Sequence, residues 1–230
     1  ESSGRHHLLQ RRASKRCVRA MSSDTACSSL PPLGEPGSSV SLWLMPSEGD
    51  AEYAKLQDLI NRHSARLGMP SFAPHATLLG GVQLQGGQEG WKDVLYACYK
   101  LASELEPLEM TCKDAAGFPK WNQCLLCTME LTEELKQANM KAQLYLRPPG
   151  DGALEPSFAP PVGLPHLSIA YTDFADEAAR AAAVAEVAEK EQWLTGFKYV
   201  AKSLSVWYTA GGLGCVPRWR KVVDFPLGSA

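Results

Sequence analysis

Two short stretches repeat one pattern and constrain the fold more than any other feature of the chain. Residues 74–79 read Pro-His-Ala-Thr-Leu-Leu, and residues 165–170 read Pro-His-Leu-Ser-Ile-Ala. A proline, which lacks an N–H, is tolerated at the first residue of a β-strand. Residues i and i+2 of a strand lie on one face, so the histidine and the hydroxyl residue of each stretch share a face. The two pairs are His75 with Thr77 and His166 with Ser168.

Helical and strand patterns alternate around these two stretches. Apolar spacing predicts helices over residues 50–67, 90–104, 132–143 and 176–193. Further strands are predicted near 39–44, 75–82, 107–113, 122–130, 196–209 and 219–225. This order contains a strand–helix–strand unit twice and predicts an α+β fold with largely antiparallel sheets.

Charge is distributed unevenly along the chain. Residues 1–23 carry six Lys/Arg and one acid, whereas the remainder has a net charge of −7. The acidic remainder argues against a protein that binds long nucleic acid non-specifically, and it leaves a small phosphate substrate in a local pocket possible. We expect a basic, Ser- and Pro-rich tail over residues 1–37 and a folded domain over 38–230. The start resembles an organelle transit peptide; a true start at Met21 and a disordered tail are the alternatives.

Cysteine usage and hydropathy bear on compartment and cofactors. Seven cysteines without a secretory signal pattern predict a cytoplasmic protein with mostly reduced thiols. No apolar run approaches the roughly 18 residues that a membrane span needs. Cys124 and Cys127 lie at i and i+3 of a predicted strand, so they point to opposite faces and suit neither one metal nor one disulfide. We expect no metal and no cofactor.

Two adjacent strands of the repeated type would surround one pocket with two imidazoles and two hydroxyls. This set suits a phosphate diester: a neutral imidazole accepts a proton from water, an imidazolium donates one to the leaving oxygen, and hydroxyls bind the non-bridging oxygens. Histidine offers both forms because its pKa lies near neutrality. The alternative is that both histidines are structural core residues, which is also our interpretation of His63 on the helix over 50–67.

The repeated stretches resemble the paired motifs of the two-histidine (2H) phosphoesterases, and the chain is most similar to plant-type cyclic phosphodiesterases. Ser41-Leu-Trp43-Leu-Met-Pro46 resembles the first strand of that family, and Gln123-Cys124-Leu-Leu resembles its strand between the motifs. Tyr171 stands where these enzymes carry an aromatic near the substrate. The resemblance covers about residues 38–227.

The resemblance implies two antiparallel-sheet lobes with flanking helices, related by pseudo-twofold symmetry, with the active site in the central cleft. It implies metal-independent hydrolysis of ADP-ribose 1'',2''-cyclic phosphate, a by-product of tRNA splicing, to ADP-ribose 1''-phosphate. It also implies hydrolysis of nucleoside 2',3'-cyclic phosphates to 2'-phosphates. By this resemblance His75 and His166 are the acid/base pair, and Thr77 and Ser168 are phosphate ligands. If the 3' oxygen leaves, His75 is expected to be the acid and His166 the base; the opposite assignment stays open.

Aromatic and basic side chains supply further candidates. Tyr171, Trp121 and Phe118 are candidates for substrate binding, with a core role as the alternative for the last two. A regular strand would turn Tyr171 away from the face of the second motif, so its role requires a bend or the end of the strand. Arg218 and Arg220 are candidates for a pyrophosphate contact or are plain surface charges.

Two other functions stay open at this point. An RNA-end-processing enzyme of the same superfamily, such as a 2'-5' RNA ligase-like protein or an RNA 3'-end phosphodiesterase, should show a basic track leading from the cleft. A non-catalytic module would bind nucleotides without turnover. We expect a monomer that acts on a small cyclic-phosphate nucleotide, with neither a membrane nor a long nucleic acid as partner.

Overall fold

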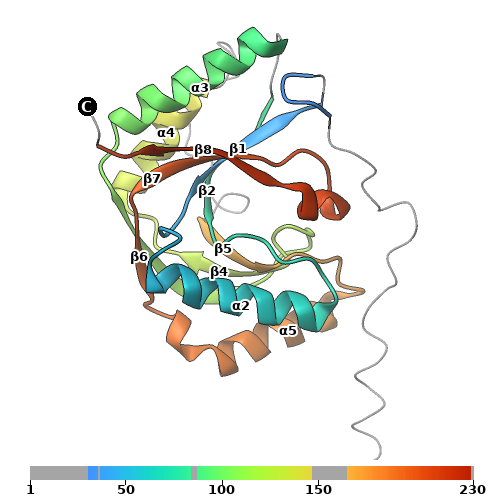
Figure 1. Cartoon of the computed structure of the whole chain (residues 1–230). Coiled ribbons are helices and arrows are strands. Elements are labelled where there is room, and N and C mark those ends of the chain that lie inside the picture. The colour runs from blue at the N-terminus through green and yellow to red at the C-terminus, as the bar shows by residue number, and fades with distance from the viewer. Residues whose placement is uncertain (1–30, 36, 84–86, 147–164, 229–230) are drawn as a thin grey trace, which may run out of the picture.

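The computed structural model describes residues 31–35, 37–83, 87–146 and 165–228 (Figure 1). The predicted tail over residues 1–37, with its possible transit peptide, falls largely outside the described residues, and the division at residue 38 stays a prediction. Among the helices of the described part, none is both long and apolar enough to cross a bilayer.

The predicted helices and strands form, with shifted boundaries. The helices are α2 (Ala51–Leu67), α3 (Gly87–Ser103), α4 (Glu133–Leu146) and α5 (Glu177–Lys190), with short 3-10 turns η2 (Gln192–Leu194) and η3 (Leu213–Arg218). The strands are β1 (Ser39–Leu44), β2 (Ala76–Gln83), β3 (Leu108–Ala116), β4 (Leu125–Met129), β5 (His166–Ala170), β6 (Lys198–Ala201), β7 (Ser203–Tyr208) and β8 (Arg220–Pro226).

The strands of the described part form one curled antiparallel sheet of eight, in the order β6-β3-β4-β5-β2-β1-β7-β8. The motif strands β5 and β2 lie at its centre, with three strands beyond each. Helices α2 and α5 pack on the half that ends in β6, and α3 and α4 pack on the half that ends in β8 (Figure 1). The expected α+β fold with antiparallel strands and flanking helices is confirmed, and the strands expected in two lobes join in one curled sheet.

Alternation along the central strands separates a core face from a polar face. Leu42 on β1, Leu78 on β2 and Leu167 on β5 are almost completely buried and share one core with apolar residues of all four helices. Their neighbours along the strands, such as Ser41 and Trp43 on β1, point to the opposite face. The chemistry of the repeated motifs therefore lies on the face that the helices leave open.

One predicted strand is wrong in its connectivity. The stretch over residues 196–209 forms two strands, because β6 pairs with β3 at one edge of the sheet while β7 pairs with β1 in the other half. The chain changes partner at Lys202. The buried apolar residues fall at odd positions in β6 and at even positions in β7, so the adjacent polar residues Lys202 and Ser203 mark a change of phase that the single predicted strand overlooks.

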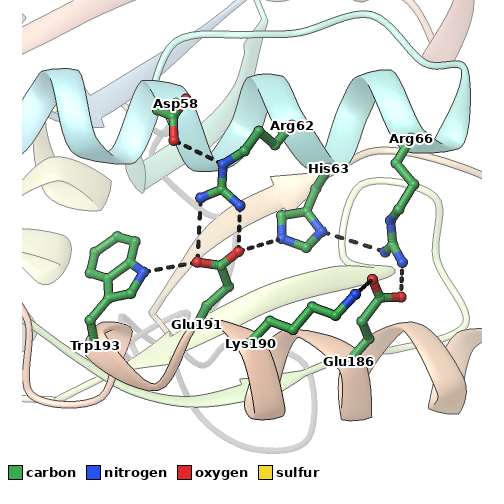
Figure 2. Close-up of polar contacts among 8 residues, drawn as sticks. All are labelled: Asp58, Arg62, His63, Arg66, Glu186, Lys190, Glu191 and Trp193. Carbon is green, nitrogen blue, oxygen red and sulfur yellow. Dashed lines mark hydrogen bonds and ion pairs between the residues drawn. The ribbon is translucent and has the colours of Figure 1, made fainter.

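A buried carboxylate ties α2 to the end of α5, far along the chain (Figure 2). Glu191 accepts hydrogen bonds from Arg62 Nη1 at 2.6 Å, His63 Nε2 at 3.2 Å and Trp193 Nε1 at 2.8 Å. The Arg62 guanidinium contributes most to lowering the pKa of Glu191 to about 2, against the opposing effect of burial. His63 thus has a structural partner, in line with its expected role.

We predict that Glu191→Gln lowers the free energy of unfolding by about 3 kcal/mol at pH 7, because the amide no longer balances the Arg62 charge. The folded-state pKa lies below the unfolded one, so this stabilisation is present above pH 4.5 and is lost as pH falls through 2. Urea unfolding at pH 7 and pH 3 should show a smaller difference at pH 3. Exposed Glu189→Gln on the same helix is the control, and equal stability of the wild type and Glu191→Gln at pH 7 would contradict the assignment.

Candidate active site

The register between β2 and β5 brings the two motifs together. Ala76 lies opposite Leu167, and the strands run antiparallel. One step to either side of this pair, the same register sets His75 opposite Ser168 and Thr77 opposite His166. Opposite residues of an antiparallel pair share a face, with Cβ atoms about 5 Å apart. The motifs therefore meet head to tail across the centre of the sheet.

A cavity of about 570 Å³ opens over this polar face. Three of the four motif side chains line it: His75, Thr77 and His166. The fourth, Ser168, lies just beneath, because its side chain is buried and its hydroxyl donates a hydrogen bond to the Asn122 carbonyl at 3.4 Å. Asn122 itself lines the cavity, so Ser168 is bonded to a lining residue without being one of the described lining residues.

His75 is held on several sides and is 4% exposed. Its Nδ1 lies 2.7 Å from the Ala73 carbonyl, which can only accept, so Nδ1 carries the proton. Trp43 stacks on the ring at 3.5 Å between centroids, with 7° between the planes. Tyr171 donates its hydroxyl to Nε2 at 3.4 Å. Burial lowers the pKa of His75 to about 3, so the neutral ring, with Nε2 as acceptor, is its resting form.

Tyr171 reaches the cavity because β5 carries an irregularity. Leu125 pairs with Ala170 and Leu126 with Ser168, so two steps on β5 match one step on β4. Such a bulge reverses the alternation beyond it. Tyr171 follows immediately and lines the cavity beside His75, as its expected role requires. Burial raises the pKa of Tyr171, so its hydroxyl keeps its proton.

Aromatic rings wall the cavity around His75. Trp121, a predicted candidate, lines it and meets Tyr171 edge-on at 5.5 Å. Trp219 also lines it and contacts Trp43, Trp121 and Tyr171 at 5.8 to 6.3 Å between centroids. Sequence reasoning missed Trp219, because no strand pattern or motif precedes it at the end of η3.

Other predicted residues lie outside this wall. Phe118, Arg218 and Arg220 are not among the described residues that line the cavity. Phe118 instead donates its backbone N–H to the Gln123 carbonyl at 2.8 Å and so closes the turn before β4. The Arg220 guanidinium lies 4.9 Å from the centre of the Tyr208 ring. The pyrophosphate contact considered for the two arginines therefore has no support from the cavity.

The cavity also has a hydroxyl-rich side. Ser39 and Ser41 of β1 and Thr209 after β7 line it, and the hydroxyls of Ser41 and Thr209 are 2.7 Å apart. The lining residues that the structure describes include no Asp or Glu. A neutral or anionic ligand therefore meets hydrogen-bond donors here without a carboxylate to repel it.

No cysteine is among the described residues that line the cavity. Within the described ranges, no group of three His, Cys, Asp or Glu side chains is placed to hold a metal ion. Cys124 and Cys127 are free thiols buried in the core, as expected. Cys98 and Cys112 are also free thiols, and both are buried.

We predict that His75 makes the protein less stable in mild acid. Its folded-state pKa lies below the unfolded value of about 6.5, so folding must release a proton and stability falls as pH drops below 6.5. Between pH 7 and 5 the wild type should lose about 2 kcal/mol more than His75→Gln, which carries no titrating ring. Denaturant unfolding of both at pH 7 and 5 measures this, and parallel pH curves would contradict a buried neutral His75.

Solved structures with a similar fold include a protein titled "phosphoesterase", at a TM-score of 0.53 and 14% identity over 83% of this chain and 98% of that one. Another is E. coli LigT complexed with phosphate, at a TM-score of 0.50 and 14% identity over 83% of this chain and 97% of that one. Identities this low show the fold alone.

Sequence comparison is more specific. No curated protein sequence matches the chain. The family model described as "Cyclic phosphodiesterase-like protein" matches residues 38–227, the stretch that carries both motifs and every strand of the described sheet. The chain therefore belongs to the cyclic phosphodiesterase-like family of 2H phosphoesterases.

Proposed function

We propose that the protein hydrolyses small cyclic phosphodiesters without a metal ion. The substrates that we propose are nucleoside 2',3'-cyclic phosphates, opened to 2'-phosphates, and ADP-ribose 1'',2''-cyclic phosphate, opened to ADP-ribose 1''-phosphate. One observation carries the proposal: the pairing of Ala76 with Leu167 joins the two motif strands so that His75, Thr77 and His166 line one cavity. Two imidazoles can supply both proton transfers that hydrolysis needs.

The contacts of His75 favour a base role rather than the acid role expected for a leaving 3' oxygen. A ring whose pKa is lowered to about 3 is neutral near pH 7 and offers Nε2 as an acceptor. In the proposed step, Nε2 of His75 takes a proton from water while the water oxygen bonds to phosphorus. His166, which is partly exposed, donates a proton to the sugar oxygen as its bond to phosphorus breaks.

The two hydroxyl residues are the proposed phosphate ligands. The non-bridging oxygens gain charge as water attacks, and hydroxyl donors stabilise that charge. Thr77 already lines the cavity. Ser168 would turn its hydroxyl from the Asn122 carbonyl towards the phosphate, which a hydroxyl does by rotation about one bond.

The walls of the cavity support a nucleotide as the substrate. Trp121, Trp219 and Tyr171 offer apolar ring surface for a base, and the hydroxyls of Ser41 and Thr209 can bind ribose oxygens. An RNA-end-processing role is less well supported, because Lys120 is the sole Lys or Arg among the described lining residues. A long RNA would call for a basic track.

We predict that the full chain opens adenosine 2',3'-cyclic phosphate and ADP-ribose 1'',2''-cyclic phosphate in excess EDTA, with the 2'-phosphate as the nucleoside product. His75→Ala and His166→Ala should each lower kcat by about 100-fold or more, because each removes one proton transfer. Chromatography that resolves the 2'- and 3'-phosphates measures rate and product together.

His63→Gln is the matched control, since His63 contacts Glu191 rather than the cavity, and it should retain activity. Wild-type rates in either His75→Ala or His166→Ala would refute the two-histidine mechanism. Tight nucleotide binding by a wild type that shows no turnover would identify a binding module instead.

The base assignment predicts a particular pH profile. The acidic limb of kcat/KM reports the base of the free enzyme, so it should lie well below pH 6 in the wild type. Trp43→Ala uncovers the His75 ring to water, which relieves the desolvation that lowers its pKa, and should move this limb upward. Trp193→Phe, beside Glu191, is the control. A limb that stays in place in Trp43→Ala would argue for His75 as the acid.

A further inference from the structure

Lys120 gives the cavity a positive charge away from the two motifs. It lines the cavity and is exposed. Among the residues that the structure describes, no carboxylate lies within 4.0 Å of its ammonium group, whereas other exposed lysines such as Lys198 and Lys202 contact acids at 2.6 and 3.2 Å. A lysine facing a cavity whose described lining contains no acid is an unused partner for an anion.

The backbone around Lys120 is fixed before any ligand binds. Lys120 donates its N–H to the Phe118 carbonyl at 2.7 Å, and its own carbonyl accepts from Gln123 at 2.8 Å. The Trp121 carbonyl accepts from Thr172 at 3.2 Å, which joins this turn to the end of β5. The turn is also closely packed, since a Cβ on Gly117 would clash with the Cys124 carbonyl just before β4. Lys120 therefore extends from a rigid rim of the cavity.

Lys120 lies on the turn before β4, outside the two motif strands that carry the histidines. Its neighbour Trp121 contacts Tyr171 at 5.5 Å between ring centroids, and the Tyr171 hydroxyl lies 3.4 Å from Nε2 of His75. Lys120 therefore comes to the same cavity from a different segment than the histidines and is available to a second anionic group of the ligand.

We propose that Lys120 forms a second anion subsite, which selects nucleotides that carry a further phosphate or diphosphate besides the cyclic one. This inference rests on the proposed function, because it assumes that the cyclic phosphate lies at the motifs. Lysine suits the task as a compact charge on a flexible stem that follows a phosphate in more than one pose. Lys120 takes the pyrophosphate-binding role for which Arg218 and Arg220 were candidates. Neither arginine is among the described lining residues.

The test compares two substrates that differ at one position. Adenosine 2',3'-cyclic phosphate with a 5'-hydroxyl is compared with the same compound carrying a 5'-diphosphate. In the wild type, kcat/KM should be higher for the diphosphate. Lys120→Gln should lower the ratio of the two kcat/KM values about tenfold, as expected for one lost charge contact near a protein surface. Lys120→Arg should recover most of it.

Lys113→Gln is the matched control, because Lys113 is exposed on β3 and is not among the described lining residues. It should leave the ratio unchanged. About 0.5 M salt should reduce the wild-type ratio, since screening weakens an exposed charge contact. A second arm measures binding of 2'-AMP and of 2'-phospho-ADP to each protein by tryptophan fluorescence.

The outcomes separate the two proposals. Turnover without a preference for the diphosphate, or a preference that survives in Lys120→Gln, overturns the anion subsite and leaves hydrolysis intact. A wild type that turns over neither compound, yet binds 2'-phospho-ADP more tightly than 2'-AMP through Lys120, refutes the proposed hydrolysis and retains the subsite. Equal binding of the two ligands in such a protein overturns both.

Discussion

The pairing of β2 with β5 at Ala76 and Leu167 is the constraint on which the site depends. Both residues face the core, where they are 2% and 0% exposed, so the opposite face of each strand receives the motif side chains. A slip of one residue would bury His75 against the helices and expose a leucine to the cavity. The apolar residue in the middle of each motif therefore positions the histidine before it and the hydroxyl residue after it.

Two histidines of this chain are buried beside different partners. Burial lowers the pKa of both His63 and His75, yet their partners differ. Glu191 contacts His63 and works against that effect, whereas His75 has a carbonyl, an indole and a phenol around it. The first arrangement stabilises a junction between helices. The second leaves a neutral acceptor beside an open cavity, which is a form that acid–base chemistry can use.

Local periodicity explains how much the sequence predicts. The face shared by His75 and Thr77 follows from a period of two, and the fold class follows from the order of elements, so both are visible without a structure. Features that depend on residues far apart in the chain are not visible from the sequence in this way. The change of partner at Lys202 and the bulge that turns Tyr171 inward depend on hydrogen bonds between segments far apart in the chain. The positions of Trp219 and Lys120 in the cavity depend on how such segments come together around it.

The antiparallel pairing of the two motifs bears on how this fold could have evolved. Each histidine faces a hydroxyl residue from the other half, so a single half holds no complete pair, whereas two identical halves related by a twofold axis would hold both. An ancestral homodimer of half-length chains satisfies this geometry, and gene fusion would then free the two copies to diverge. Trp43 beside Thr77 and Leu126 beside Ser168 occupy equivalent places and show that divergence. In this history a symmetric pair of motifs came first, and unequal neighbours later gave the two halves of the site different surroundings.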